Sequence, residues 1–279
     1  MPELPEVENV VRTLSPQLVG SVIKRATVLC PISIAGLDPE CFTDQLAGAA
    51  VRDVQRRGKF IVCALDQGWY LVIHLRMTGQ LILTQPTALK PRFARVSFDL
   101  RDGRVLWFSD MRKFGRLLLT TDPNGIFREL GPEPFDPSLG DLQFFHRLSR
   151  HKKPVKSLLL DQSFLAGLGN IYADESLFQA GLNPRRPAAS LNIEEASKLL
   201  QAIREVLTKA IVNRGTTIAN YVDASGRPGD NQNYLCVYGR AGQACVRCQT
   251  TLVRLRLSGR STYYCPSCQP AAAQSDQTC

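Results

Sequence analysis

Two pairs of cysteines near the carboxyl end constrain the folding of this chain more than any other feature. Each pair has the spacing C-x2-C, and sixteen residues separate the two pairs. The four residues are Cys245, Cys248, Cys265 and Cys268. This spacing is typical of four-thiolate zinc sites, in which each pair lies in a tight turn. Because four thiolates complete a tetrahedral coordination sphere, we expect one structural Zn²⁺ here and no catalytic metal.

The segment around these cysteines is basic. No acidic residue lies between Asp230 and Asp276, whereas five arginines do: Arg240, Arg247, Arg254, Arg256 and Arg260. The whole chain carries 34 Lys and Arg against 25 Asp and Glu, a net charge of +9, which suggests a polyanionic partner. A predicted hairpin of segments 252–257 and 261–264 would present guanidinium groups to phosphates. Zinc ribbons also bind proteins, so this segment alone predicts only a binding module.

Size and composition are those of an ordinary globular protein. The chain has 279 residues, enough for two domains, of which 44% are hydrophobic and 21% charged. No apolar run reaches the length of a membrane span and no signal peptide opens the sequence, so we expect a cytoplasmic protein without a membrane partner. The other five cysteines are an odd, unpatterned set, which fits a reducing compartment.

The amino-terminal half is predicted to be one helix followed by β structure. An apolar stripe with helical spacing indicates a helix that begins near residue 3: Leu4, Val7, Val10, Val11 and Leu14. Eight short β-branched or aromatic runs follow, at 21–28, 51–55, 60–65, 69–75, 80–84, 94–100, 105–109 and 116–120. Strands of this number and spacing suggest two packed sheets, with a helix near 38–46.

The remaining sequence is predicted to be mainly helical. A linker rich in Pro and Gly at 131–137 precedes apolar residues at helical spacing in 142–148, 155–160, 171–180 and 193–213. We therefore predict an α+β protein: a two-sheet β-sandwich domain at 1–131, a helical domain at 132–234 and a zinc finger at 235–269. Residues 270–279 are predicted to be a disordered tail.

The first six residues allow two interpretations. If Met1 is removed, Pro2 offers a secondary amine, which at neutral pH is partly unprotonated and can attack an aldehyde-type carbon, with Glu3 as proton donor or acceptor. The resulting iminium withdraws electrons from adjacent bonds. Proline and glutamate are also favoured in the first turn of any helix. This segment alone favours an ordinary helix start over a catalytic role, and the choice between the two depends on the rest of the chain.

Candidate nucleic-acid contacts lie in three segments: 161–170, 74–79 and 110–115. Gly167, Gly169 and Asn170 precede a predicted helix, an arrangement that can hold an anion, although an ordinary capping loop looks the same. The lysines Lys152, Lys153 and Lys156 lie just before it and favour a phosphate. Met77 and Phe114 follow strand-like runs and are plausible wedges beside Arg112, although such residues more often lie in a core.

Together these segments resemble the bacterial formamidopyrimidine-DNA glycosylase family over nearly the whole chain to Gln269. The motifs that carry the resemblance are PELPEVE at 2–8, QRRGK at 55–59, HLRMTG at 74–79, DMRKFG at 110–115, GLGNIY at 167–172, VYGR at 237–240 and the cysteines with Gly259-Arg260.

The resemblance implies a DNA repair enzyme that flips out and removes oxidised purines from duplex DNA and then cuts the abasic site. It implies that Pro2 attacks C1′, Glu3 donates a proton and Glu6 orients this end of the chain. It further implies that Lys59 assists β-elimination and Arg260 δ-elimination. The residues that it assigns to the DNA backbone are His74, Lys153, Lys156, Asn170, Tyr238 and Arg260. Those that fill the gap left by the flipped base are Met77, Arg112 and Phe114. The implied partner is damaged double-stranded DNA, bound by a monomer.

Two places depart from the family pattern. Many members carry histidine where Phe93 lies, and Arg92 or Arg95 would have to replace its DNA contact. Loop 216–233, which the resemblance implies closes over the flipped base, ends in Gly229-Asp230-Asn231-Gln232-Asn233, which does not match the family pattern.

Two other functions are consistent with parts of the sequence. The related endonuclease VIII enzymes act on oxidised pyrimidines, but Leu4 and the pair Arg112 and Phe114 favour the purine branch. A non-catalytic zinc-ribbon DNA-binding protein would explain the cysteines and the basic charge without any role for Pro2.

Overall fold

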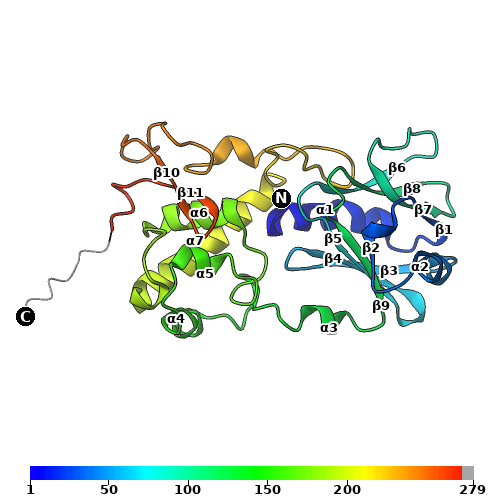
Figure 1. Ribbon diagram of the computed structural model, residues 1–279, viewed down its shortest axis with the longest axis horizontal. Helices are drawn as coiled ribbons and strands as arrows, with labels where there is room; N and C mark the ends of the chain where they lie inside the picture. Colours follow the sequence, from blue (N-terminus) through cyan, green and yellow to red (C-terminus); the bar gives the residue numbers. More distant parts are fainter. Residues whose placement is uncertain (272–279) are drawn as a thin grey trace, which may run out of the picture. The chain divides into compact units, whose positions relative to one another are not determined.

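The structure, a computed structural model, describes residues 1–271 and groups them into two compact units (Figure 1). The β unit consists of Met1–Glu129 and Ala210–Gln232. The helical unit consists of Leu130–Lys209 and the described residues from Asn233 to Ala271. The predicted tail lies mainly outside the described residues. Among residues 1–271, no helix has both the length and the apolar character needed to cross a bilayer.

The β unit contains two sheets. The four-stranded sheet has the order β1-β7-β8-β6, with β1 at Ile23–Val28, β6 at Gly79–Thr84, β7 at Ala94–Leu100 and β8 at Val105–Asp110. The five-stranded sheet has the order β2-β9-β5-β4-β3, with β2 at Ile34–Ala35, β3 at Val51–Arg57, β4 at Phe60–Leu65, β5 at Tyr70–His74 and β9 at Arg116–Thr120. Every pairing is antiparallel except β2 with β9. All eight predicted strands are present.

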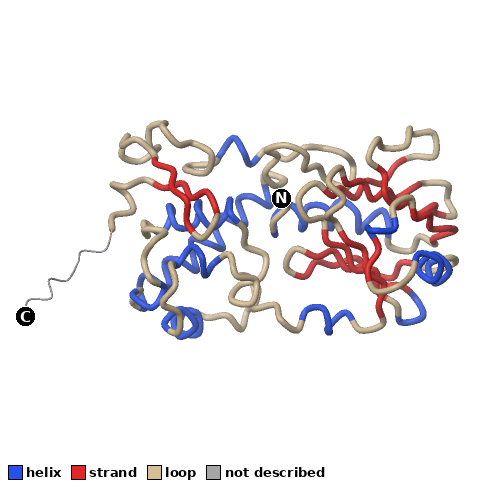
Figure 2. The backbone as a smooth tube through the Cα atoms, in the orientation of Figure 1, coloured by secondary structure: helices blue, strands red, loops and turns tan. Residues whose placement is uncertain are grey.

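Two helices of the β unit pack on these sheets (Figure 2). Helix α1, Leu4–Leu18, packs on β3, and α2, Pro39–Leu46, packs on β1. The apolar stripe of α1 is buried in the core that the inner faces of both sheets share, as its spacing predicted. Shorter helical turns lie at Pro31–Ser33, Asp66–Gly68 and Pro123–Phe127 (α3).

The helical unit contains α4 at Asp141–Ser149, α5 at Val155–Leu159, α6 at Asn170–Ala180 and most of α7, Ile193–Val212, with a 3-10 turn at Ala188–Ser190. A 3-10 turn at Asn231–Tyr234 leads to the cysteine-bearing segment. Strands β10, Val253–Leu257, and β11, Arg260–Tyr264, form the predicted hairpin, and β11 packs against α6. The predicted α+β fold class, with two sheets, a helical region and a terminal hairpin, is confirmed.

Candidate functional site

The amino-terminal residues are held in place by the start of α1. Glu3 is the N-cap residue, and its backbone N–H donates to Glu6 Oε2 at 2.8 Å in a reciprocal capping box. Pro2 is buried, and the side chains of Glu3 and Glu6 are only 2% and 1% exposed. A helix N-terminus can be capped by solvated side chains, so capping alone does not require buried carboxylates. The burial of Glu3 and Glu6 beside Pro2 therefore indicates a further role for this segment.

Glu6 also holds the loop that follows α7. Its Oε1 accepts a hydrogen bond from the backbone N–H of Thr216 at 2.7 Å. Gly215, with φ of 80°, allows this approach, since a Cβ at that position would lie 3.1 Å from Glu6 Oε1. One buried carboxylate therefore connects the amino-terminal segment with loop 214–232, the segment expected to cover a flipped base.

Lys59 lies in the turn between β3 and β4. The preceding Arg56 forms an ion pair with Glu8 of α1 at 2.8 Å and donates to the carbonyl of Gly58 at 3.1 Å. Burial pushes the pKa of Glu8 up, but Arg56 and Arg12 together outweigh it and lower that pKa. The ion pair fixes the Lys59 turn against α1, and Lys59 itself is buried.

His74, at the end of β5, is a neutral imidazole. Its Nδ1 accepts from the backbone N–H of Arg76 at 3.0 Å, which leaves the proton on Nε2. Burial, with the nearby charges of Arg76 and Lys59, lowers the pKa of His74 to about 3. The ring also packs perpendicular to Phe60, with the ring centroids 4.6 Å apart. His74 can therefore donate one hydrogen bond through Nε2–H, and it carries no charge near neutral pH.

The three predicted wedge residues lie on exposed loops and not in the core. Met77 is 39% and Phe114 48% exposed, and the Arg112 guanidinium stacks 4.7 Å from the centre of the Phe114 ring. The register pairs Gly79 with Asp110, which brings the two loops together. The structure thus exposes the side chains that a wedge needs.

Asp110 organises these two loops, a role that was not predicted from the sequence. Its side chain is completely buried and accepts from the backbone N–H of Gly115 at 2.7 Å, from that of Arg112 at 3.2 Å and from the Thr78 hydroxyl. Asp110 therefore holds both loops, and the Thr78 hydroxyl that donates to it also accepts from the Arg112 N–H at 3.1 Å.

The structure distinguishes the two arginines proposed to replace the family histidine. Arg95 donates through Nε to the carbonyl of Asp110 at 2.8 Å and so has a structural partner. Arg92 is exposed and lies over the ring of Phe93 at 5.1 Å. Of the two, Arg92 is the one presented to solvent.

In the helical unit, some polar groups of the glycine-rich loop already have hydrogen-bond partners within the protein. The Gly167 N–H donates to Gln162 Oε1 at 3.0 Å, so this amide of the predicted anion cradle already has a partner. Asn170 Nδ2 donates to the carbonyl of Ser261 in β11 at 3.0 Å. Lys153 is half exposed and pairs with Asp161, and that pairing, with Ser163, lowers the pKa of Asp161 to about 2.

Lys156 lies inside the helical unit rather than on its surface. It is 1% exposed, and its Nζ lies 2.8 Å from each of Asp174 Oδ1, the Ser261 carbonyl and Thr262 Oγ1. Burial raises the pKa of Asp174 to about 7, and Lys156 opposes this rise. The phosphate contact implied for Lys156 would require this buried arrangement to open.

The neighbouring residue on α6, Glu175, holds the segment that carries Tyr238. Its two oxygens accept from three consecutive backbone N–H groups, those of Cys236, Val237 and Tyr238, at 2.8–2.9 Å. The Tyr238 ring packs against that of Tyr263, with centroids 5.1 Å apart. Asp174 and Glu175 were not singled out from the sequence. The available signal was that α6 has apolar residues on all sides, so that any acidic residue in it is buried.

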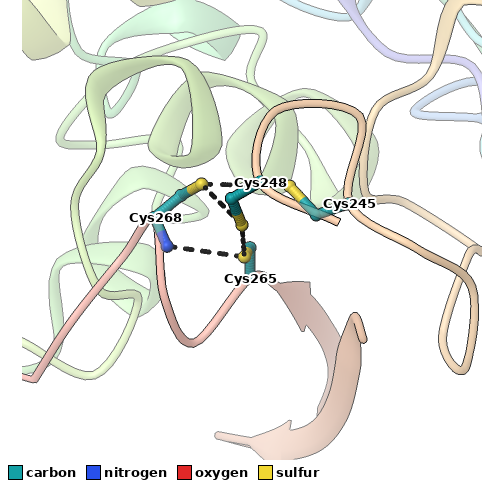
Figure 3. Close-up of side chains that lie close together, drawn as sticks. All are labelled: Cys245, Cys248, Cys265 and Cys268. Atoms are coloured by element: carbon teal, nitrogen blue, oxygen red, sulfur yellow. Dashed lines mark hydrogen bonds between the residues drawn. The ribbon is translucent and has the colours of Figure 1, made fainter. Parts of the chain in front are cut away.

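The four cysteines come together as their spacing predicted (Figure 3). Their sulfur atoms all lie within 4.8 Å of one another. Tetrahedral zinc with Zn–S bonds of about 2.3 Å requires sulfur atoms about 3.8 Å apart. The distances from Cys245 to Cys268 and from Cys248 to Cys265, 3.8 and 3.5 Å, agree with this requirement. The donor set therefore fits one structural Zn²⁺ with no open position.

Arg260 lies at the tip of the hairpin that these cysteines support. The turn between β10 and β11 is Ser258-Gly259, both with positive φ (46° and 76°), which is the two-residue turn best suited to a twisted hairpin. Arg260 follows it and is exposed.

Three protein-family models match successive parts of the chain. They are the formamidopyrimidine-DNA glycosylase N-terminal domain at residues 1–117, the formamidopyrimidine-DNA glycosylase H2TH domain at 130–221 and the zinc finger found in FPG and IleRS at 242–271. A formamidopyrimidine-DNA glycosylase from Moorella thermoacetica is 50% identical over 261 residues, covering 92% of this chain and 95% of that protein. This chain belongs to the formamidopyrimidine-DNA glycosylase family.

Other members of the family agree with this assignment. The Chloroflexus aurantiacus formamidopyrimidine-DNA glycosylase is 43% identical over 272 residues, 96% of this chain and 98% of that protein. The structure also resembles Lactococcus lactis Fpg in complex with DNA containing an abasic site, with a TM-score of 0.90, 33% identity, and coverage of 96% of this chain and 100% of that one. A complex of the same enzyme with Fapy-dG DNA gives a TM-score of 0.89, with the same identity and coverage. The chain is therefore a DNA glycosylase with a zinc finger.

Proposed function

We propose that this glycosylase removes oxidised purines, including 8-oxoguanine and formamidopyrimidines, from double-stranded DNA and then cuts the strand. The observation that carries the proposal is the buried start of α1, where Glu6 holds Glu3 next to Pro2 in a member of this family. The Lactococcus relatives in complexes with abasic-site and Fapy-dG DNA support damaged DNA as the partner. We further propose that the enzyme acts as a monomer in the cytoplasm, where the chromosome is.

Pro2 is the nucleophile in this proposal, after removal of Met1. Its nitrogen loses its proton as it forms a bond to C1′, and the damaged base leaves with the electrons of the glycosidic bond and takes up a proton. Glu3 donates the proton that opens the sugar ring at O4′, which leaves an iminium between Pro2 and C1′. Two features support these roles: Pro2 and Glu3 are buried, and Glu6 fixes the Glu3 backbone.

The iminium acidifies the C2′ proton, and its loss expels the 3′ phosphate in β-elimination. In this proposal Lys59 supplies a proton to this step and Arg260 to the δ-elimination that releases the 5′ phosphate. The Arg56–Glu8 ion pair that fixes the Lys59 turn supports the first role. The exposure of Arg260 at the hairpin tip supports the second.

We propose that the neutral His74, Arg92, Lys153, Asn170, Tyr238 and Arg260 contact the backbone. Met77, Arg112 and Phe114 replace the flipped nucleotide in the stack, which their exposure on adjoining loops supports. The four cysteines would hold Zn²⁺, whose role is to stabilise the fold around the hairpin.

Incision of matched duplexes tests the assignment. Duplexes that differ only in carrying 8-oxoguanine, thymine glycol or no lesion are compared, with the wild type and Glu3→Gln. We expect cleavage at 8-oxoguanine above that at thymine glycol, with Glu3→Gln losing base removal far more than binding. Preference for thymine glycol would favour an endonuclease VIII activity instead. Binding without incision of any duplex would favour a non-catalytic zinc-ribbon protein.

A further inference from the structure

The buried Lys156–Asp174 pair has a structural role that the proposed DNA contacts do not explain. Lys156 is on α5 and Asp174 on α6, and both side chains are almost completely buried. Lys156 Nζ donates hydrogen bonds to the Ser261 carbonyl and the Thr262 hydroxyl, each at 2.8 Å, and forms an ion pair with Asp174 Oδ1 at 2.8 Å. The ammonium group is thus held by two hydrogen bonds to β11 and by the ion pair with α6.

Asp174 holds the same strand through its other oxygen. Its Oδ2 accepts from the backbone N–H of Tyr263 at 3.0 Å, and Asn170 of the same helix donates to the Ser261 carbonyl. Three consecutive residues of β11 are therefore fixed to helices α5 and α6, and the middle one, Thr262, is completely buried. Arg260 immediately precedes this run.

The metal site alone does not fix the tip of the hairpin. A hairpin of two five-residue strands is marginally stable by itself. Cys265 anchors the far end of β11, and Arg260 is five residues away, which in an extended strand is about 17 Å. Between the cysteines and the exposed turn, the contacts of Lys156 and Asp174 supply the second anchor.

We propose that Lys156 and Asp174 are positioning residues that fix β11 on α5 and α6 and thereby direct Arg260, and that Lys156 does not itself bind a DNA phosphate. The role of Arg260 in strand cleavage rests on the proposed function. The hairpin anchor itself does not.

Two single variants separate this proposal from a direct phosphate contact. Asp174→Asn removes one negative charge, so if Lys156 bound phosphate it would leave DNA affinity unchanged or increase it. If the pair positions the hairpin, Asp174→Asn and Lys156→Met both weaken binding, since each leaves the other buried group without its partner. Lys198→Met, on the exposed face of α7, is the control for loss of one positive charge.

The first measurement is amide hydrogen exchange in the metal-loaded protein without DNA. We expect the Tyr263 amide, which donates to Asp174, to exchange about tenfold faster or more in both variants. The Ile73 amide in β5, a strand of the other unit, is the internal reference for intact folding. Unchanged exchange at Tyr263 in Asp174→Asn would overturn the anchor. If Lys156→Met fails to fold, Asp174→Asn alone still decides the question.

The second measurement is the affinity for duplex DNA and the products of an abasic-site duplex. We expect about tenfold weaker binding in both variants, unchanged binding in Lys198→Met, and a smaller share of δ-elimination product. Tighter binding of Asp174→Asn would refute the positioning role. A wild type that cuts no damaged DNA would refute the proposed function, whereas the exchange result would still stand.

Discussion

Because Glu6 connects two segments of the β unit, we predict that Glu6→Gln strongly lowers the free energy of unfolding. Glu6 is 1% exposed and accepts from the backbone N–H of Glu3 and from that of Thr216, each through a separate carboxylate oxygen. Glu6→Gln keeps the shape of the side chain but replaces one acceptor oxygen with an NH2 group. That NH2 must face one of the two N–H donors, which is then buried without an acceptor.

The magnitude follows from these contacts. Leaving a buried N–H unsatisfied costs about 1–3 kcal/mol, and the remaining bond loses the extra strength that a charged acceptor gives, about 1 kcal/mol. We therefore expect the free energy of unfolding of the β unit to fall by about 2–4 kcal/mol. The Thr216 amide should also exchange faster, because loop 214–232 loses a contact to α1.

Urea denaturation followed by tryptophan fluorescence measures this change. The chain has two tryptophans, Trp69 and Trp107, and both lie in the β unit, so their signal reports on the unit that contains Glu6. Glu40→Gln, at an exposed position of α2, is the matched control and should change the free energy by less than about 0.5 kcal/mol. A Glu6→Gln loss no larger than that of the control would refute the reasoning.

Three further predictions concern the metal, the imidazole and the phosphates. Cys248→Ser should lower metal content from one ion per chain and weaken DNA binding, because coordination supplies local folding energy; full metal content with unchanged affinity would argue against the site. The pKa of His74 is lowered by burial from 6.5 to about 3, so the folded state resists protonation. Stability should fall as pH drops from 6.5 towards 3, by at most about 1.4 kcal/mol per pH unit, and His74→Gln should remove this contribution; identical pH profiles by urea denaturation would contradict it. If the enzyme neutralises about five phosphates, its affinity should fall about 500-fold between about 50 and about 200 mM salt, whereas a flat response in a binding titration would exclude the phosphate contacts.

Structural elements could be predicted from the sequence where they depend on residues close together in the chain. The apolar stripe that begins at Leu4 predicted the start of α1, and short β-branched or aromatic runs separated by turn residues predicted all eight strands. The metal site was predictable because its spacing encodes two tight turns on one hairpin. The parallel pairing of β2 with β9 was not, because two residues of strand carry almost no pattern and their partner lies more than 80 positions along the chain.

The buried acidic residues show most clearly what could not be predicted from the sequence. Asp174 and Glu175 have no distinctive neighbours in sequence, and their partners lie in segments 261–263 and 236–238. A lysine in a basic segment, Lys156, has the same sequence signature whether it faces a phosphate or a buried carboxylate. Only the tertiary structure, through burial and the count of acceptors, distinguishes these two roles.

Reductive trapping of the covalent intermediate tests the central claim most directly. Metal-loaded protein, shown by intact mass to lack Met1, is mixed with an 8-oxoguanine duplex and borohydride, and the adduct is digested and sequenced by mass spectrometry. We expect one protein–DNA adduct, with the modification on the amino-terminal nitrogen of Pro2. An adduct on a lysine, or efficient strand cleavage by protein whose amino terminus is blocked, would contradict the account.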